Sequence, residues 1–280
     1  MILAFGSATE GAAFNALLAA PGALALAAYA AAALLPQGDG SRLRASLLIA
    51  WLAHALAIAV DTSGAGAPTA GARFGFAPAL SVTLWLVIGV YLVESRSLPL
   101  IGVRRALAML GATAVVLALL FPGELRPHAG SRWAPLHWVM GIASYGLFGA
   151  AVLHAAMLSR ADRQMRQLPV GAATSPAPLG LPLLRLERLT FRFVAAGFAV
   201  LTAALVLGWW FANPWRWDHK TVFSILGWAV FAALLAGRRA FGWRGPRALR
   251  WLYAGAGLLL LAYVGSRFVL EVVLHRPPAI

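Results

Sequence analysis

The chain has 280 residues, of which 61% are hydrophobic and only 11% charged, and its 23 Lys and Arg against 9 Asp and Glu give a net charge of +14. A soluble domain carries about 25% charged residues, so this composition excludes an ordinary soluble protein and indicates a polytopic membrane protein without a soluble domain of useful size. The basic excess is then explained by arginine-rich cytoplasmic loops, and we expect no nucleic acid as a partner.

Eight apolar blocks follow one another along the chain, each close to the roughly 20 residues that a helix needs to cross a bilayer. We therefore expect an all-α protein with eight membrane-spanning helices in a single domain, residues 1–280. Residues 160–187 are expected to form a flexible loop with a short basic end. The first ten residues contain no basic residue, so no cleaved signal peptide is assigned. The spans are placed at 11–35, 43–61, 76–94, 104–121, 133–159, 188–212, 220–238 and 248–274.

The distribution of Lys and Arg between the loops predicts the orientation. With the N-terminus outside, the inner loops hold 16 basic residues and the outer loops hold 6. Because basic residues concentrate in cytoplasmic loops, we expect both termini to lie outside. The tryptophan-rich loop between the sixth and seventh spans, residues 209–220, then lies on the outer face.

Histidine, tryptophan and basic side chains gather at this predicted outer face. His137 begins the fifth span, His275 follows the eighth, and the loop between them in sequence reads NPWRWDHK. Imidazole is a normal axial ligand of haem iron, aromatic rings can cover a porphyrin, and Arg or Lys can pair with its propionates. The chain has no cysteine, which excludes a covalent haem site of the C-x-x-C-H type within it. We therefore expect haem b, held non-covalently, with His137 and His275 as the axial ligands of its iron.

The segment WRWDHKTVFSILGWAVFAALL, together with the following GWRGPRALRWLYAGAGLLLLAYVGSRFVLEVVLH, resembles the cytochrome c assembly protein family. This is the CcsA, ResC and CcmC group of haem-handling membrane proteins, whose hallmark is an outer tryptophan-rich segment that ends in W-x-W-D and is flanked by two histidines. Trp215, Trp217 and Asp218 match the end of that segment, and the two histidines match the flanking pair. The resemblance covers residues 133–276 best, and the first four spans by hydropathy and helix order.

One departure from the family pattern lies directly after the W-x-W-D residues. Full cytochrome c synthases usually read W-D-P-K-E, whereas this chain has His219 and Thr221 in place of the proline and the glutamate. The shorter tryptophan segment and the eight-helix layout look most like the YpjD-type branch, to which the HemX-type branch is related.

The resemblance implies a function in cytochrome c biogenesis at the bacterial inner membrane. The protein would transport or present haem at the outer face, with other cytochrome c assembly proteins or apocytochrome c as partners. The sequence holds no convincing carboxylate pair, Ser-His-Asp set or phosphate-binding glycine loop, so we expect no independent catalytic activity and at most a part in a haem-attachment system.

Each candidate residue also has a structural interpretation. His137 and His275 could be ordinary interfacial histidines, and Trp215, Trp217 and Asp218 could belong to a structural loop turned by Pro214. Trp210, a candidate for contact with haem, also sits where an aromatic belt at the membrane surface would place it. His54, within the second span, is either a second haem ligand or one side of a hydrogen bond between helices. Arg267 and Glu271 form either a buried ion pair, or a propionate contact and a partner for the second nitrogen of His275.

Two other functions fit the same composition. One is a HemX-like regulatory subunit of haem metabolism, which acts by contact with other proteins. The other is a proton- or ion-coupled transporter, in which His54, Asp61, Arg267 and Glu271 form a polar path. Broken helix pairs in the two halves would favour the transporter, and the sequence does not show them. His154, nearer the inner end of the fifth span, is expected only to pack or to reach the interface.

Overall fold

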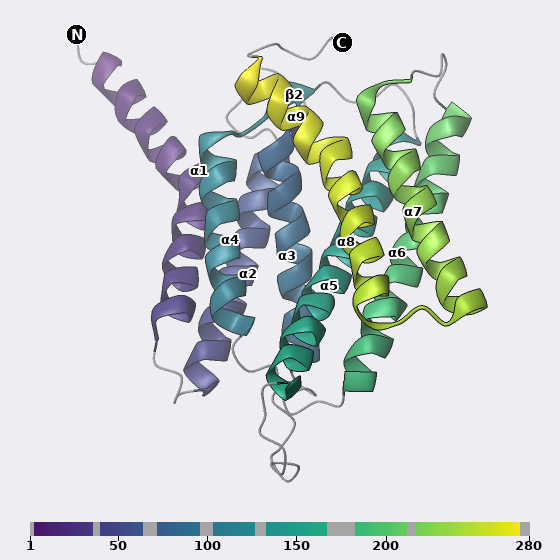
Figure 1. Ribbon diagram of the computed structural model, residues 1–280. Helices are drawn as coiled ribbons and strands as arrows, with labels where there is room; N and C mark the ends of the chain where they lie inside the picture. Colours follow the sequence, from purple (N-terminus) through teal and green to yellow (C-terminus); the bar gives the residue numbers. More distant parts are fainter. Residues whose placement is uncertain are drawn as a thin grey trace. The chain divides into compact units, whose positions relative to one another are not determined.

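The computed structural model describes residues 3–35, 40–63, 72–95, 103–126, 133–166, 183–211 and 217–274. Eight helices in these ranges are long and apolar enough to cross a membrane (Figure 1). This confirms the predicted all-α, polytopic fold. By its internal contacts the chain divides into two compact units, which are described one at a time. Unit 1 is Met1–Ile88 with Gly102–His128, and unit 2 is Gly89–Ile101 with Ala129–Ile280.

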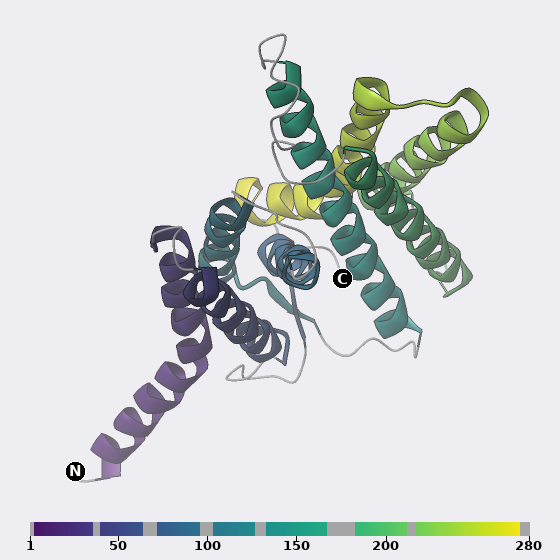
Figure 2. The same ribbon diagram turned by 90° about the horizontal axis from the view of Figure 1, so that it is seen from below.

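Unit 1 is built on α1 (Leu3–Leu34), which packs along both α2 (Gly40–Ser63) and α4 (Val103–Leu120), as Figures 1 and 2 show. The first part of α3 (Phe76–Glu94) completes it. Gly111 lets the helices come close, because a Cβ there would lie 2.6 Å from the Tyr29 ring. Small residues at such contacts are typical of membrane helix packing.

Two tryptophans join α2 to α3 within unit 1. The rings of Trp51 and Trp85 stack with centroids 4.9 Å apart and an angle of 5° between their planes. Each indole N–H donates to the backbone carbonyl of the other residue, at 2.9 and 3.0 Å. The pair therefore satisfies both indole groups inside an apolar layer, where an unpaired N–H would be costly.

A short antiparallel ribbon, which the sequence did not predict, joins two loops of unit 1. β1 (Ala72–Phe74) pairs with β2 (Glu124–Arg126), with Arg73 opposite Leu125. Gly123 makes the approach possible: its φ is 76°, and a Cβ there would lie 2.6 Å from the Phe74 carbonyl oxygen. A left-handed φ with so close a backbone contact requires glycine.

Unit 2 contains α5 (Ala134–Arg166), α6 (Leu183–Phe211), α7 (His219–Phe241) and α8 (Gly245–Leu260). α5 packs along α6, and α7 along α8 (Figure 1). Phe148 and Phe231 stack at the centre of its core, with ring centroids 3.9 Å apart.

The last span continues beyond α8 with two π-helical turns, η1 (Leu261–Gly265) and η2 (Val269–Val273), on either side of the short α9 (Ser266–Phe268). The Tyr145 hydroxyl of α5 donates to the carbonyl of Leu259, just before the first π turn. Single π turns within α-helices often occur at functional sites, and Arg267 lies between these two.

The predicted spans agree with the helices to within three residues except at three ends. α1 begins at Leu3 rather than near residue 11. The predicted loop 160–187 was wrong at both edges, because α5 continues to Arg166 and α6 already begins at Leu183. The spans had been ended at the last apolar residues, whereas Arg, Gln and Met are good helix formers and carry α5 past the apolar stretch.

Candidate functional site

His137 lies on the first turns of α5, and its ring is turned toward α6. Its Nδ1 is 2.9 Å from the carbonyl oxygen of Ala204. A carbonyl can only accept, so Nδ1 carries the hydrogen and donates, and the lone pair of the imidazole is on Nε2. A histidine that binds a metal usually has its other nitrogen held in this way. The fold therefore fixes both the tautomer and the ring orientation that an Nε2 ligand needs.

Gly208 provides the space that the His137 ring occupies against α6. A Cβ at position 208 would lie 2.8 Å from Cε1 of His137 and 3.2 Å from Nδ1. Any other side chain at this position would push the ring away from α6 and from the Ala204 carbonyl.

Asp218 caps the start of α7. Its side-chain oxygen accepts the backbone N–H of Thr221 at 2.8 Å, and its backbone has the extended conformation typical of an N-cap. The aspartate of the W-x-W-D segment therefore has a structural function here, whatever else it contacts.

Lys220 lies on the first turn of α7, close after the end of α6 in the chain. Its Nζ lies over the Tyr263 ring, 5.5 Å from the centroid. A contact between α5 and α6 and a contact between α7 and the last span thus lie toward one end of unit 2. We call this group, His137, Gly208, Lys220 and Tyr263, the His137 cluster.

The tryptophans named in the sequence analysis lie on the surface of this same end where the structure describes them. Trp210 at the end of α6 is 77% exposed, and Trp217 before α7 is 73% exposed. Both side chains are therefore mostly exposed at this end of unit 2. Trp215 and His275 lie outside the described residues.

Arg267 and Glu271 face each other on the last span of unit 2. The distance from Nη1 of Arg267 to Oε1 of Glu271 is 4.0 Å, and their side chains are 13% and 11% exposed. This geometry agrees with the ion-pair interpretation. The propionate contact of Arg267 stays a prediction.

His54 lies in a buried hydrogen-bond network of unit 1. Its Nδ1 is 2.9 Å from the Tyr29 hydroxyl of α1, and its Nε2 is 2.8 Å from the Ser81 hydroxyl of α3. Both ring nitrogens are thus engaged by hydroxyl groups from neighbouring helices, as the helix–helix hydrogen-bond interpretation expects. Its ligation of haem stays a prediction.

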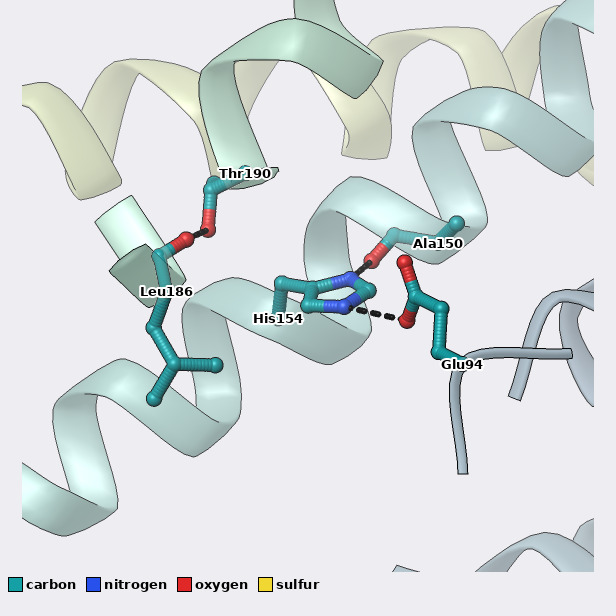
Figure 3. A network of polar contacts seen from close by, with 5 residues as sticks. All are labelled: Glu94, Ala150, His154, Leu186 and Thr190. Atoms are coloured by element: carbon teal, nitrogen blue, oxygen red, sulfur yellow. Dashed lines mark hydrogen bonds and ion pairs between the residues drawn. The ribbon is translucent and has the colours of Figure 1, made fainter. Parts of the chain in front are cut away.

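A second buried histidine has a partner that the sequence analysis missed. His154 Nδ1 donates to the Ala150 carbonyl at 2.7 Å, and its Nε2 is 2.7 Å from the Glu94 carboxylate, as Figure 3 shows. The ring also stacks on Phe193, with centroids 5.3 Å apart. Because Nδ1 already holds its hydrogen, a single proton lies between Nε2 and Glu94. The pair is therefore either imidazolium with carboxylate or imidazole with carboxylic acid.

The partners of these two histidines could not be found from local sequence. Glu94 is 60 residues from His154, and Tyr29 is 25 residues from His54. A polar or ionisable side chain within a membrane span needs a partner, so the sequence indicates that each histidine has one. It does not indicate which residue that partner is.

Comparison with known proteins identifies the family. A family described as Cytochrome C assembly protein matches residues 24–274. The inner membrane protein YpjD of Escherichia coli strain K12 is 30% identical over 198 residues, 69% of this chain and 73% of that protein. The cytochrome c biogenesis protein CcsA of Synechococcus sp. strain CC9902 is 30% identical over 227 residues, 68% of this chain and 72% of that protein. No solved structure matches the chain.

Eight apolar helices and these relatives define a multi-pass protein of the inner membrane. The chain belongs to the cytochrome c assembly protein family, and its role lies in cytochrome c biogenesis. This confirms the resemblance drawn from the W-x-W-D segment and the flanking histidines. The match begins at residue 24, so it also includes the second half of the first span and the next three spans, for which the sequence analysis had only hydropathy and helix order.

Proposed function

We propose that this protein holds a non-covalent haem b at the outer end of unit 2 and presents it for the maturation of c-type cytochromes. The observation that carries the proposal is the bond from Nδ1–H of His137 to the Ala204 carbonyl at 2.9 Å. It places the lone pair on Nε2, the nitrogen that an axial ligand uses. Bound haem would supply the iron porphyrin that a c-type cytochrome carries.

The donor set of the His137 cluster fits this group. His137 offers an imidazole nitrogen, Lys220 offers a positive charge for a propionate, and Tyr263 and Trp217 offer aromatic surface. The chain has no cysteine, so it forms no thioether bond itself and would release haem by giving up ligand and ring contacts alone. Attachment would then take place on a partner that carries the cysteines, an apocytochrome c.

The second axial ligand is proposed to be His275, with Trp215, Trp217 and Trp210 as the aromatic surface and Arg267 as a further cation for a propionate. The support for His275 is its position just after the last span, whose outer half carries Tyr263 of the His137 cluster. The capping bond of Asp218 holds the start of α7, and with it Lys220, in place.

The test is ligand replacement in the full-length protein purified in detergent. His137→Gly and His275→Gly should each lose haem or change its absorption spectrum, and added imidazole should restore part of the signal, since only a nitrogen donor is missing. Trp217→Ala should lower occupancy without rescue by imidazole, because a surface rather than a ligand is lost. His219→Gly is the matched control: this histidine is exposed at the start of α7 and should change nothing. Unchanged spectra in both single variants would refute ligation by the two histidines.

The proposed contact of Lys220 with a haem propionate can be tested by removing the propionate charge from the ligand. Lys220→Met should weaken binding of haem by about fivefold, the effect of about 1 kcal/mol for an exposed ion pair. The dimethyl ester of haem has no propionate charge, so the same variant should bind it as well as the unchanged protein does. An equal loss for both ligands would assign Lys220 to packing instead.

A further inference from the structure

The turn between α7 and α8 carries an unusual concentration of arginine. Arg238, Arg239, Arg244, Arg247 and Arg250 fall within 13 residues, and no acidic residue lies between Asp218 and Glu271. This is the predicted inner end of unit 2, opposite to the His137 cluster. A positive-inside signal accounts for the number of arginines in this turn. It does not require any particular arrangement of their side chains.

Trp243 is held rigidly at the centre of this turn. Gly242 ends α7 with a φ of 64°, and the N–H of Trp243 donates back to the Gly237 carbonyl at 3.3 Å. The indole lies directly on Gly237, where a Cβ would be only 2.5 Å from the ring. Trp251 packs against it, with ring centroids 5.3 Å apart.

The arginines around Trp243 divide into one structural residue and an exposed group. Arg238 donates to Glu187 of α6 at 2.8 Å and to the Trp243 carbonyl at 3.2 Å, and it lies 3.5 Å over the Phe191 ring. The Glu187 carboxylate is therefore paired with Arg238. The exposed residues, which we call the arginine turn, are Arg239, Arg244, Arg247 and Arg250.

Arg247 is fixed in a way that suits a phosphate. Its guanidinium lies over the Trp243 ring, 4.2 Å from the centroid. Stacking engages the face of the guanidinium, and the N–H groups at its edge remain suited to two parallel bonds with an oxyanion. Pre-ordering by the indole also lowers the conformational entropy that the side chain loses on binding.

We propose that the arginine turn is a binding site for the headgroup of an anionic phospholipid. Clusters of basic residues beside membrane helices recognise such headgroups, and tryptophan prefers the headgroup level. Phe241, 77% exposed beside the turn, offers apolar surface next to the charges. Positive charge and apolar surface side by side match a lipid, which has a phosphate and acyl chains, better than free phosphate.

The experiment counts bound lipids on the full-length protein in detergent by native mass spectrometry, with phosphatidylglycerol and phosphatidylcholine offered at equal concentrations. Phosphatidylglycerol should bind preferentially. In Arg247→Gln/Arg250→Gln its affinity should fall by about 20-fold, at about fivefold for each basic residue near the surface. Inorganic phosphate added in excess should compete poorly. Full competition by phosphate would show that the site takes the bare anion and would overturn the lipid assignment.

Charge-conserving variants separate this site from a topology signal. Arg247→Lys/Arg250→Lys keeps the charge and hence the orientation, but lysine cannot form the two-pronged bond or the planar stack, so affinity should still fall several-fold. Arg160→Gln/Arg163→Gln, which removes two exposed arginines from the end of α5, should leave it unchanged. If the control lost as much affinity for phosphatidylglycerol, or if the lysine variant bound the lipid as well as the unchanged protein does, the arginine turn would be a topology signal alone.

Discussion

Gly208 allows the proposed haem site to be tested by a single methyl group. In Gly208→Ala the new Cβ would lie 2.8 Å from Cε1 of His137, well inside the 3.4 Å at which ordinary contact begins. The ring has to move by roughly half an ångström or more, and it can only move away from α6. The Ala204 carbonyl is on α6 too, so the 2.9 Å bond from Nδ1 stretches past its normal range.

The magnitude follows from two opposing effects. Replacing glycine by alanine within a helix stabilises it by about 1 kcal/mol, whereas losing the hydrogen bond costs about 1 kcal/mol. Overall stability should therefore change little. Haem affinity responds only to the displaced ring and should fall by about fivefold, the equivalent of that lost bond. The measurement is titration of the purified protein with haem, followed by Soret absorbance, together with a thermal unfolding curve.

Gly141 supplies the matched control. It lies on α5, one turn after His137, and a Cβ there would meet nothing within 4 Å. Gly141→Ala should raise the unfolding temperature and leave haem affinity unchanged. Combining Gly208→Ala with His137→Gly, with imidazole added, should abolish the effect of the alanine, because the clashing ring is gone. If Gly208→Ala weakened haem binding equally in that background, its effect would not pass through His137, and the reasoning from the ring position would fail.

Three further predictions address other parts of the chain. His219→Cys should be labelled by a membrane-impermeant thiol reagent in intact cells, whereas Phe241→Cys should not be labelled. The chain has no cysteine of its own that would react. The reverse labelling pattern would overturn the predicted orientation. Asp218→Ala should lower stability by about 1 kcal/mol by removing the cap of α7, whereas Asp218→Ser should retain it; urea or thermal unfolding would show both. His54→Ala should lower stability by about 1–3 kcal/mol for each hydroxyl left unpaired yet leave haem at the outer end, and complete loss of haem at normal protein levels would contradict this.

The spans could be predicted because each depends on a local property, a run of apolar residues long enough to cross the bilayer. The helix ends at Leu3, Arg166 and Leu183 were less accessible, since hydropathy marks where the apolar run stops and not where hydrogen bonding stops. The pairing of β1 with β2 connects loops about 50 residues apart in the chain and has no local signal. The π turns around Arg267 have no local signal in the sequence either.

For the site, residue types were predictable and their partners were not. His137 was identified from its place at a span end and from the family pattern, but nothing local indicates that Ala204 would accept from its Nδ1 or that Gly208 would make room for it. Lys220 was counted only as a charge of an outer loop. Its contact with Tyr263 depends on the last span returning to the start of α7, which only the folded chain shows.

The departure from W-D-P-K-E can now be given a physical meaning. Asp218 is the N-cap of α7, so His219 and Thr221 occupy the first and third helical positions. Proline suits the first position because no hydrogen-bonded N–H is lost there, and glutamate at the third completes a capping box. Both replacements thus fall where the helix start is stabilised, and here the Asp218 side chain still binds the Thr221 N–H at 2.8 Å. Asp218, which holds the turn, and Lys220, whose Nζ lies over the Tyr263 ring, are the residues that match the family pattern. The two replacements therefore change how α7 begins and leave the Asp218 cap intact.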